Sequence, residues 1–522
     1  GFASGGYMAN IRLNNSTINF SSQQQYLCRN TNIVNYDSVV WQRVFLNCNK
    51  KPQNILEPSS ETPGKVTNEN VKYTREPPFL YFDKKKKSYV LRVPILEENK
   101  NGYNFNYSVN KTCIDYSYVA YSDSKKLDTK TFTVIGLDNF KTKISDDYKK
   151  DVSKCINNAF KKFNIIVLKP GIYYLNNPII LKSNQYLIGL GMVSLRTCSK
   201  NPCIKTNEHV KDIFLYSLIL EAGISSDSDD SGPMHVTSLL RLDYNSNQPA
   251  LTQSDNKPVN FLSDIFVKFG GNTKLIPKST SVDTMVNINL NDVLIDHIWV
   301  WRADHDEKDI TNSLTTEWQA KHNIINKGNN IVYYGLFAEH AVNNCVEFYG
   351  NNCEVYFFQN EAAYEFNPNM SGSNYLYNII DNPDNKYEDG NVGYKVYVDL
   401  SSNNIYSYYV DTKVKNHTLK GAGAYTVFFH SDKQNGLYAM YKLPSKKIQN
   451  NYKNIFVVII SPFPDNRPTN GGTIWISNNL EDVNPTSINN IWNTTKKIPH
   501  DPIFFDQSKG GVLGPIYLSI DN

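Results

Sequence analysis

Residues 296–306 read DHIWVWRADHD and bring two tryptophans, an arginine, two histidines and three acids into one short segment. In an extended strand, successive side chains point to opposite faces. Trp299 and Trp301 therefore share one face, and Ile298 and Val300 share the other. If the aliphatic face points inward, the tryptophans form an outer platform on which sugar rings can stack. The alternative is that both indoles are core residues or pack against a second module.

Acids recur at one position of the strands around this segment. Asp304 closes the first strand, and Glu339 and Glu361 close NNIVYYGLFAEH and NNCEVYFFQNE, which begin alike and end about 22 positions apart. If each segment is one coil of a stack, the acids share a corner, and adjacent coils lie about 4.8 Å apart. Glycosidases use carboxylate pairs about 5 to 10 Å apart. His305 and His340 directly follow two of these acids and are expected to tune the pair. We also expect both histidines to bind substrate, together with Trp299, Trp301 and Arg302.

Each of these residues also has a structural alternative. Asp304 and His305 can simply satisfy backbone amides at a corner of the stack. Arg302 can tie Asp304 or Glu339 in place instead of touching a substrate. Glu361 follows Gln and Asn, a polar setting that suits a turn as well as a catalytic acid.

The surrounding pattern predicts an all-β protein that stacks as a parallel β-helix. Short β-rich segments recur at about 20 to 25 residues, as expected of a solenoid whose ends need caps. An amphipathic segment at 146–163 predicts a short capping α-helix. We expect short strands and a linker in 1–75, a hairpin and connecting segment in 76–130, the main β-helix with appended strands in 131–480, and an irregular tail in 481–522.

The composition excludes several classes of function. The 522 residues carry a net charge of only +4, so no phosphate-binding field or nucleic-acid partner is indicated. The run Lys84–Lys87 lies between two β-rich segments and is interpreted as a solvated hairpin tip. No apolar run approaches the roughly 20 residues that span a bilayer. The cysteines lack paired CxxC spacing, and we expect no metal and no cofactor.

The cysteines and glycosylation sequons favour a secreted protein, extracellular or at the cell surface. By proximity, the sequence suggests disulfides Cys28–Cys48, Cys198–Cys203 and Cys345–Cys353, which leaves Cys113 and Cys155. Candidate glycosylation sites are Asn14, Asn15, Asn19, Asn106, Asn110, Asn369, Asn416 and Asn493.

A series of motifs in fixed order resembles a known group. These motifs are SGGYMAN, SSQQQYLCRN, REPPFLYFD, LKPGIYYL, WVWRADH, YGLFAEH and YFFQNE. Their order resembles secreted bacterial and fungal double β-helix proteins, often labelled "coagulation factor 5/8 type domain" or "adenylyl cyclase" proteins. Their plan in turn resembles glycoside hydrolase family 55, the exo-β-1,3-glucanases, in which two right-handed parallel β-helices lie side by side with a cleft between them. The resemblance implies a right-handed parallel β-helix of the pectin-lyase-like kind, with terminal coils of a first β-helix plus a linker in 1–75.

The resemblance implies roles for the acids. By position, Glu361 is the candidate general acid, while Asp304 and Glu339 orient water or bind sugar hydroxyls, in an inverting reaction. The chain departs from the group in two ways: Asp306 follows WRADH where glycine is expected, and most of a first β-helix is missing. We therefore expect a separate chain that carries that half, or self-assembly through exposed β-helix ends.

Three functions remain open from the sequence. The first is a secreted glycoside hydrolase acting on a β-glucan-like polysaccharide. The second is a non-catalytic structural or carbohydrate-binding protein that assembles into a coat or fibre. The third is a polysaccharide lyase, although lyases usually need a basic residue where this corner is rich in acids.

Overall fold

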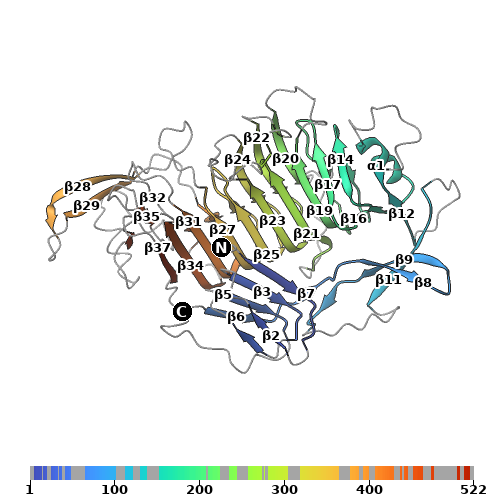
Figure 1. Cartoon of the computed structure of the whole chain (residues 1–522), viewed down its shortest axis with the longest axis horizontal. Coiled ribbons are helices and arrows are strands. Elements are labelled where there is room, and N and C mark those ends of the chain that lie inside the picture. The colour runs from blue at the N-terminus through green and yellow to red at the C-terminus, as the bar shows by residue number, and fades with distance from the viewer. Residues whose placement is uncertain are drawn as a thin grey trace.

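The chain forms a long stack of parallel β-strands with a smaller parallel sheet against its side (Figure 1). The structure is a computed structural model, and it describes residues 5–13, 16–19, 25–32, 35–37, 42–48, 65–100, 112–121, 130–137, 152–206, 210–223, 234–243, 257–272, 276, 280–303, 318–363, 377–386, 392–398, 406–427, 436–437, 440–444, 451–461, 472–474, 503–505 and 511–517. All structural statements below concern these residues.

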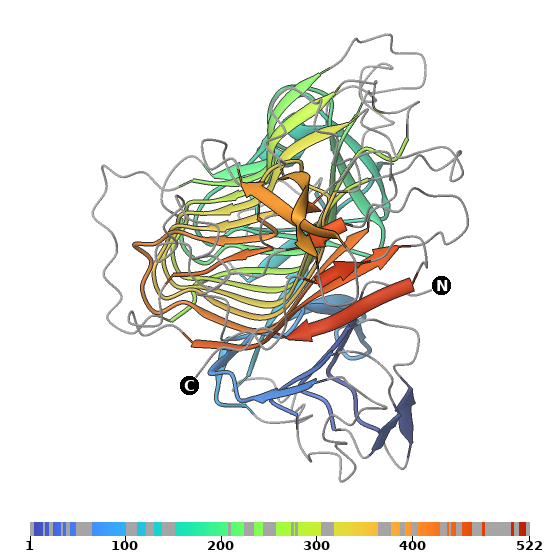
Figure 2. The ribbon, with the colours of Figure 1, turned by 90° about the vertical axis from the view of Figure 1, so that its left-hand side faces the viewer.

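Two sheets build the main stack, and the chain alternates between them. The long sheet contains β13 (Ile165–Leu168), β16 (Tyr186–Gly189), β19 (Phe214–Ala222), β21 (Asn260–Phe269), β23 (Val293–Arg302), β25 (Ile331–Glu339), β27 (Glu354–Glu361), β31 (Thr418–Val427) and β34 (Asn451–Ser461). The second sheet contains β15 (Ile179–Leu181), β18 (Ile204–Thr206), β20 (His235–Leu242), β22 (Ser281–Ile288), β24 (Gln319–Asn326), β26 (Val346–Phe348), β30 (Tyr408–Val410) and β33 (Tyr441–Lys442). Consecutive strands of each sheet pair in parallel, which confirms the parallel β-helix (Figure 2).

The first coils and both ends have further strands. β14 (Gly171–Leu175) pairs with β17 (Val193–Thr197), which pairs with β19, and β12 (Thr131–Ile135) precedes β13 in the long sheet. The predicted helix is α1 (Ser153–Ala159), whose Ile156 and Ala159 enter the main core at one end of the stack (Figure 1). The acids expected before this helix, in 146–151, lie outside the described residues.

The C-terminal region corrects one expectation. Within 481–522, which we expected to be irregular, lie β36 (Ile503–Phe505) and β37 (Gly511–Tyr517). β37 runs antiparallel to β34 and so closes the long sheet at this end. Two smaller groups are β28 (Tyr377–Lys386) with β29 (Val392–Val398), and β32 (Gly436–Leu437) and β35 (Gly472–Ile474) with β36.

The N-terminal sheet has the order β1 (Gly6–Ala9), β3 (Gln25–Arg29), β5 (Gln42–Leu46) and β6 (Lys65–Glu69), all parallel. β2 (Thr17–Asn19) follows β1 in sequence and β4 (Asn35–Asp37) follows β3, and these two short strands pair in parallel with each other. β7 (Tyr73–Thr74) and β10 (Glu97–Glu98) follow as a short antiparallel pair. The hairpin of β8 (Phe79–Asp83) and β9 (Ser88–Pro94) then joins the long sheet through β11 (Cys113–Tyr118). This hairpin lies within 76–130, where the sequence predicts a hairpin and a connecting segment.

A ladder of side chains fixes the register between coils. Asp292, Asn330, Asn352 and Asn416 occupy equivalent turns, each with φ between 56° and 58°. The Asn330 amide donates to Asp292 (2.8 Å), Asn352 donates to Asn330 (3.1 Å) and Asn416 donates to Asn352 (2.8 Å). Asparagine and aspartate tolerate this left-handed conformation better than other residues with a side chain.

A second column of left-handed residues bends each long strand in its middle. It contains Ser217, Asp264, His297, Gly335, Phe357, Gly421 and Asn454. The N-terminal sheet packs against this bend. His297 stacks on Tyr7 with ring centroids 4.4 Å apart, and a methyl group at Gly421 would lie 2.5 Å from Cγ2 of Val44. The close approach therefore requires glycine at that coil.

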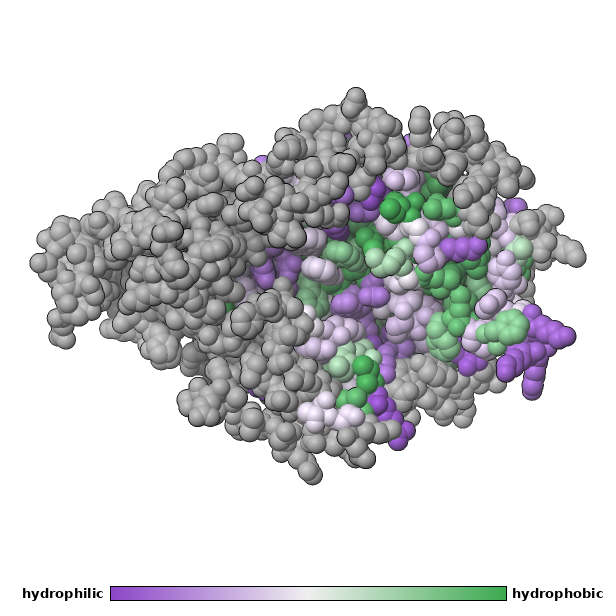
Figure 3. Space-filling view, in the orientation of Figure 1, coloured by the Kyte–Doolittle hydropathy of each residue, from purple (hydrophilic) through white to green (hydrophobic). Residues whose placement is uncertain are grey.

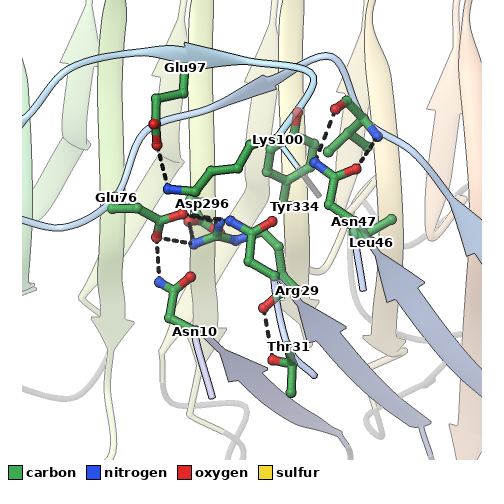
Figure 4. A network of polar contacts seen from close by, with 12 residues as sticks. Asn10, Arg29, Thr31, Leu46, Asn47, Glu76, Glu97, Lys100, Asp296 and Tyr334 are labelled. Atoms are coloured by element: carbon green, nitrogen blue, oxygen red, sulfur yellow. Dashed lines mark hydrogen bonds and ion pairs between the residues drawn. The ribbon is translucent and has the colours of Figure 1, made fainter. Parts of the chain in front are cut away.

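A buried ionic network ties the N-terminal sheet to the stack (Figure 4). Arg29 binds Glu76 with nitrogen–oxygen distances of 2.9 and 3.0 Å, and it reaches Asp296 at 2.6 Å. The Tyr7 hydroxyl also donates to Asp296 (2.6 Å), and the Asn30 amide donates to Glu76 (2.6 Å). Asp296, the first acid of the opening segment, is thus an inter-sheet contact.

The predicted disulfides are wrong for this structure, because all eight cysteines are free. Several thiols point at backbone carbonyl oxygens instead of another sulfur. Cys48 Sγ lies 3.4 Å from the Cys28 carbonyl, Cys203 Sγ lies 3.2 Å from the Leu195 carbonyl, and Cys353 Sγ lies 3.5 Å from the Gly350 carbonyl. The same correction applies to the remaining candidates, namely Cys113, Cys155, Cys198 and Cys345.

Candidate active site

The site lies on the outer face of the long sheet, beyond the bend in each strand. Strand register places Lys268, Trp301 and Glu339 side by side on three successive coils. Glu361 continues this row on the next coil, where the His340 amide donates to the Glu361 carbonyl (2.9 Å). The alternation expected for the opening segment is confirmed: Ile298 and Val300 are fully buried in the core, while Trp299 and Trp301 lie on the outer face.

Three rings form a stacked, nearly parallel cluster beside the acids. Phe266 stacks on Trp299 with centroids 4.5 Å apart and planes inclined by 13°. Trp299 and Trp301 lie 5.6 Å apart at 23°, and the Lys268 ammonium lies 5.7 Å from the Trp301 ring centroid. We call these three rings the aromatic platform. Trp299 is 36% exposed, and exposed indole surface of this kind offers a contact for the apolar face of a sugar ring.

The first acid of the pair, Glu339, is buried and carries a strongly perturbed pKa. Burial and, to a smaller extent, the neighbouring Glu361 carboxylate raise its pKa to about 7. The opposing influences are the His340 charge, the Trp299 indole N–H, which donates to Glu339 Oε2 (3.0 Å), and the Gln359 amide. Two carboxylates on adjacent coils cannot both ionise cheaply, so the pair retains a proton near neutral pH.

The second acid is the more accessible one. The Glu361 carboxyl is 14% exposed, and its Oε2 lies 3.6 Å from His340 Nε2. His340 itself is buried, and its Nδ1 lies 3.3 Å from the Arg302 carbonyl. His340 therefore contacts the acids from the protein interior and is not accessible to a ligand, so the substrate-binding role expected for it does not hold.

The substrate-binding role expected for Arg302 gives way to its structural alternative. The side chain is fully buried, its Nε donates to the His340 carbonyl, and an Nη donates to the Trp318 carbonyl (3.2 Å). A guanidinium that is buried and bound to backbone carbonyls holds the end of the strand in place, and it is not accessible to a polysaccharide.

Some predicted residues cannot be placed. Asp304 and His305 lie outside the described residues, as do the sequons at Asn14, Asn15, Asn106, Asn110, Asn369 and Asn493. Asn19 lies in β2, and Asn416 is the exposed end of the asparagine ladder.

Sequence reasoning missed Phe266, Lys268 and Gln359. Phe266 and Lys268 lie one coil before the tryptophans, in FLSDIFVKFG. Aligning that segment with DHIWVWR would have found them, because Ile265 and Val267 match Ile298 and Val300. Gln359 stands two positions before Glu361, on the same face of β27 by strand alternation.

Neither a metal-binding cluster nor a membrane-spanning helix is present in the described part of the chain. There, no group of three or more His, Cys, Asp or Glu residues is arranged to hold a metal ion. No helix in these segments has the length and apolar character to cross a membrane.

Fold and site together define a parallel β-helix protein of the pectate lyase-like kind, with a carboxylate pair beside an aromatic platform. Residues 147–361 match the model of the LAM55 pectate lyase-like domain. This range contains the platform and both acids.

Individual relatives agree with this class. The chain is 27% identical over 369 residues to an exo-beta-1,3-glucanase of Streptomyces sp. (strain SirexAA-E / ActE), which covers 70% of this chain and 52% of that protein. It thus spans about half the length of this curated relative. The chain resembles the glycoside hydrolase family 55 glucanases, as the ordered motifs indicated.

Solved structures show the same fold. The structure of sacteLam55A from Streptomyces sp. SirexAA-E superposes with a TM-score of 0.63, 23% identity, and coverage of 92% of this chain and 72% of that chain. A glutamate-to-alanine variant of sacteLam55A in complex with glucose gives a TM-score of 0.62, 24% identity, and coverage of 90% and 72%.

Proposed function

We propose that this protein is a glycoside hydrolase that cleaves β-1,3-glucan at the Glu339–Glu361 pair. The observation that carries the proposal is the buried carboxyl with a pKa of about 7, next to a second carboxyl and the stacked aromatic platform. Burial and a like charge together are the usual means by which a glycosidase keeps an acid protonated. Similarity to the Streptomyces exo-beta-1,3-glucanase supports the choice of substrate.

In this mechanism, the one proton that the pair retains passes from Glu339 to Glu361, and Glu361 delivers it to the glycosidic oxygen. Glu361 is the more exposed carboxyl, whereas Glu339 is buried. The sugar ring beside the scissile bond stacks on Trp299 and Trp301. Protonation of the glycosidic oxygen breaks its bond to the anomeric carbon and frees the leaving sugar. Water attacks the anomeric carbon from the opposite side, loses a proton to solvent as the new hydroxyl forms, and inverts the configuration.

The first experiment measures reducing-sugar release from laminarin. Glu361→Gln should lower kcat by about 10²- to 10⁴-fold, the range for loss of a general acid. Glu354→Gln is the matched control, because Glu354 lies on the same strand β27 and bonds Tyr356 (2.8 Å) away from the pair. Full activity of Glu361→Gln would exclude this acid, and polarimetry of the first product would test inversion.

Each of two other functions is supported by one specific observation. The ring platform would serve a non-catalytic carbohydrate-binding protein equally well, and laminarin binding without cleavage by folded protein would establish that function. Lys268 supplies a cation two coils from Glu339, as a polysaccharide lyase would require. An unsaturated product with new ultraviolet absorbance would identify a lyase.

We also propose that the protein is secreted and that β1 receives another strand. Sequons support secretion, and mass spectrometry of protein from its native source would detect glycans. Among the described strands, β1 is an edge of the N-terminal sheet. An edge strand accepts a further coil from another chain or a second copy. Light scattering over a concentration series would reveal such an assembly, and a strictly monomeric mass would exclude self-assembly.

A further inference from the structure

The hairpin of β8 and β9 presents a second candidate binding surface, remote from the acid pair (Figure 1). We define the hairpin tip as residues Phe82 to Tyr89. Lys84, Lys85, Lys86 and Lys87 form the turn, and all four are exposed. Asp83 Oδ1 accepts the backbone N–H groups of Lys85 (2.9 Å) and Lys86 (3.2 Å). The turn therefore has a defined shape that holds the lysines together at the end of the hairpin.

Two aromatic rings lie beside these lysines. Phe82 and Tyr89 are cross-strand partners, and their rings meet edge to face with centroids 5.4 Å apart. They are 51% and 57% exposed, among the most exposed large hydrophobic side chains described. Further along the same face, Leu91 is buried against the stack. The apolar face of the hairpin thus continues from the buried core to the tip, where the described residues leave both rings largely exposed.

The opposite face of the hairpin has its charges matched. Arg92 pairs with Asp115 (2.7 Å), and Tyr81 donates to Asp115 (2.9 Å). Asp83 is the acid within the tip, and its Oδ1 already accepts two backbone N–H groups. Four lysines therefore give the tip a local excess of positive charge that the overall net charge of +4 does not reveal. Figure 3 shows this end as strongly hydrophilic, with hydrophobic residues directly beside it.

We propose that the hairpin tip binds an acidic polysaccharide, with lysines on its carboxylates and Phe82 and Tyr89 on its sugar faces. The charged and the aromatic residues of the tip match the carboxylates and the sugar faces of such a polymer. Lysine is a hydrated point charge that suits scattered anionic groups, and aromatic rings suit the C–H faces of pyranoses. A neutral glucan would give the lysines nothing to bind. This site goes beyond the proposed hydrolase activity and would tether the protein while the acid pair acts elsewhere.

Other polyanions fit the tip less well. An anionic membrane rewards a large apolar insertion, whereas this tip offers one phenylalanine and a tyrosine. Single-stranded nucleic acid is bound along a basic groove with successive stacking platforms. The described hairpin presents its lysines in one compact turn and does not form a groove.

The test is binding of full-length protein to polygalacturonate, measured by affinity electrophoresis and by a salt series. The double variant Lys84→Glu/Lys86→Glu should bind at least about 10-fold more weakly, and wild-type affinity should fall as salt screens the charges. The double variant Phe82→Ala/Tyr89→Ala should bind several-fold more weakly with an unchanged salt dependence. All four positions are surface positions, so both proteins should fold and retain wild-type activity on laminarin.

A matched control separates the tip from overall charge. Lys161→Glu/Lys162→Glu makes the same change at two exposed lysines after α1 and should bind as wild type does. An equal loss in this control would overturn the proposal, as would absence of binding by the wild type. Equal affinity for single-stranded DNA or for phosphatidylserine vesicles, lost in the same tip variants, would overturn the choice of an acidic polysaccharide.

Discussion

Replacing Glu339 by glutamine should stabilise the protein at alkaline pH and flatten the pH dependence of its unfolding. In the folded chain the Glu339 pKa is about 7, against an ordinary value of 4.5. Between these values the folded state holds a proton that the unfolded state has released. The stability of the wild type therefore falls as pH rises from 4.5 through 7, and the loss is complete above 7.

The magnitude follows from this difference in pKa. At about 1.4 kcal/mol per pH unit, ionising Glu339 in its buried position costs about 3 kcal/mol above pH 7. Glutamine has nearly the same shape, never ionises, and keeps an oxygen to accept the Trp299 indole N–H. The variant should therefore exceed the wild type by up to about 3 kcal/mol at pH 8.5, and the two should converge at pH 4.

The assay is equilibrium unfolding in urea, followed by tryptophan fluorescence at pH 4, 5.5, 7 and 8.5. Glu354→Gln, on the same strand, should follow the wild type at every pH. If the wild type and Glu339→Gln show parallel curves from pH 4 to 8.5, Glu339 does not hold its proton to neutral pH. The proposed proton-sharing pair would then have to be abandoned.

Three further changes test other parts of the structure. Trp299→Phe removes the indole N–H that lowers the pKa of the buried glutamate, so the pH–activity profile should move to higher pH and kcat/KM should fall several-fold. Arg29→Met leaves Glu76 and Asp296 buried without their cation and should cost about 3 to 5 kcal/mol in urea unfolding at pH 7; a loss under 1 kcal/mol would contradict the network. Asn352→Ala should cost about 2 to 3 kcal/mol, because it breaks the ladder and strains a left-handed turn. Asn352→Gly should cost about 1 kcal/mol less, and equal losses would show that the backbone conformation contributes nothing.

The parts of the fold that repeat in sequence were predictable. Glu339 and Glu361 stand one coil apart, so the repeat alone brought them together. The alternation around Trp299 and Trp301 gave their outward direction, and the lysine-rich turn marked the hairpin. Each of these follows from strand periodicity, which acts over a few residues.

Contacts between distant segments were not predictable. Arg29 meets Asp296 only because the N-terminal sheet packs on the bend of the long strands. That bend places Phe357 at a φ of 71°, which is unfavourable for a bulky residue and carries no sequence signature. The cysteines misled for a related reason: closeness in sequence says nothing of whether two sulfurs face each other.

The contacts of the N-terminal sheet also set an order of events during synthesis. Tyr7 lies 289 residues before its acceptor Asp296, Gln25 lies 333 residues before the Phe358 carbonyl, and Gln42 lies 412 residues before that of Asn454. At about 5 to 20 residues per second, the N-terminal sheet leaves the ribosome roughly 15 to 60 s before Asp296 does. Throughout that time its docking face is open to other chains. A ribosome that stalls before Asn454 would therefore release a chain whose N-terminal sheet lacks one of its contacts with the long sheet, the hydrogen bond from Gln42 to the Asn454 carbonyl.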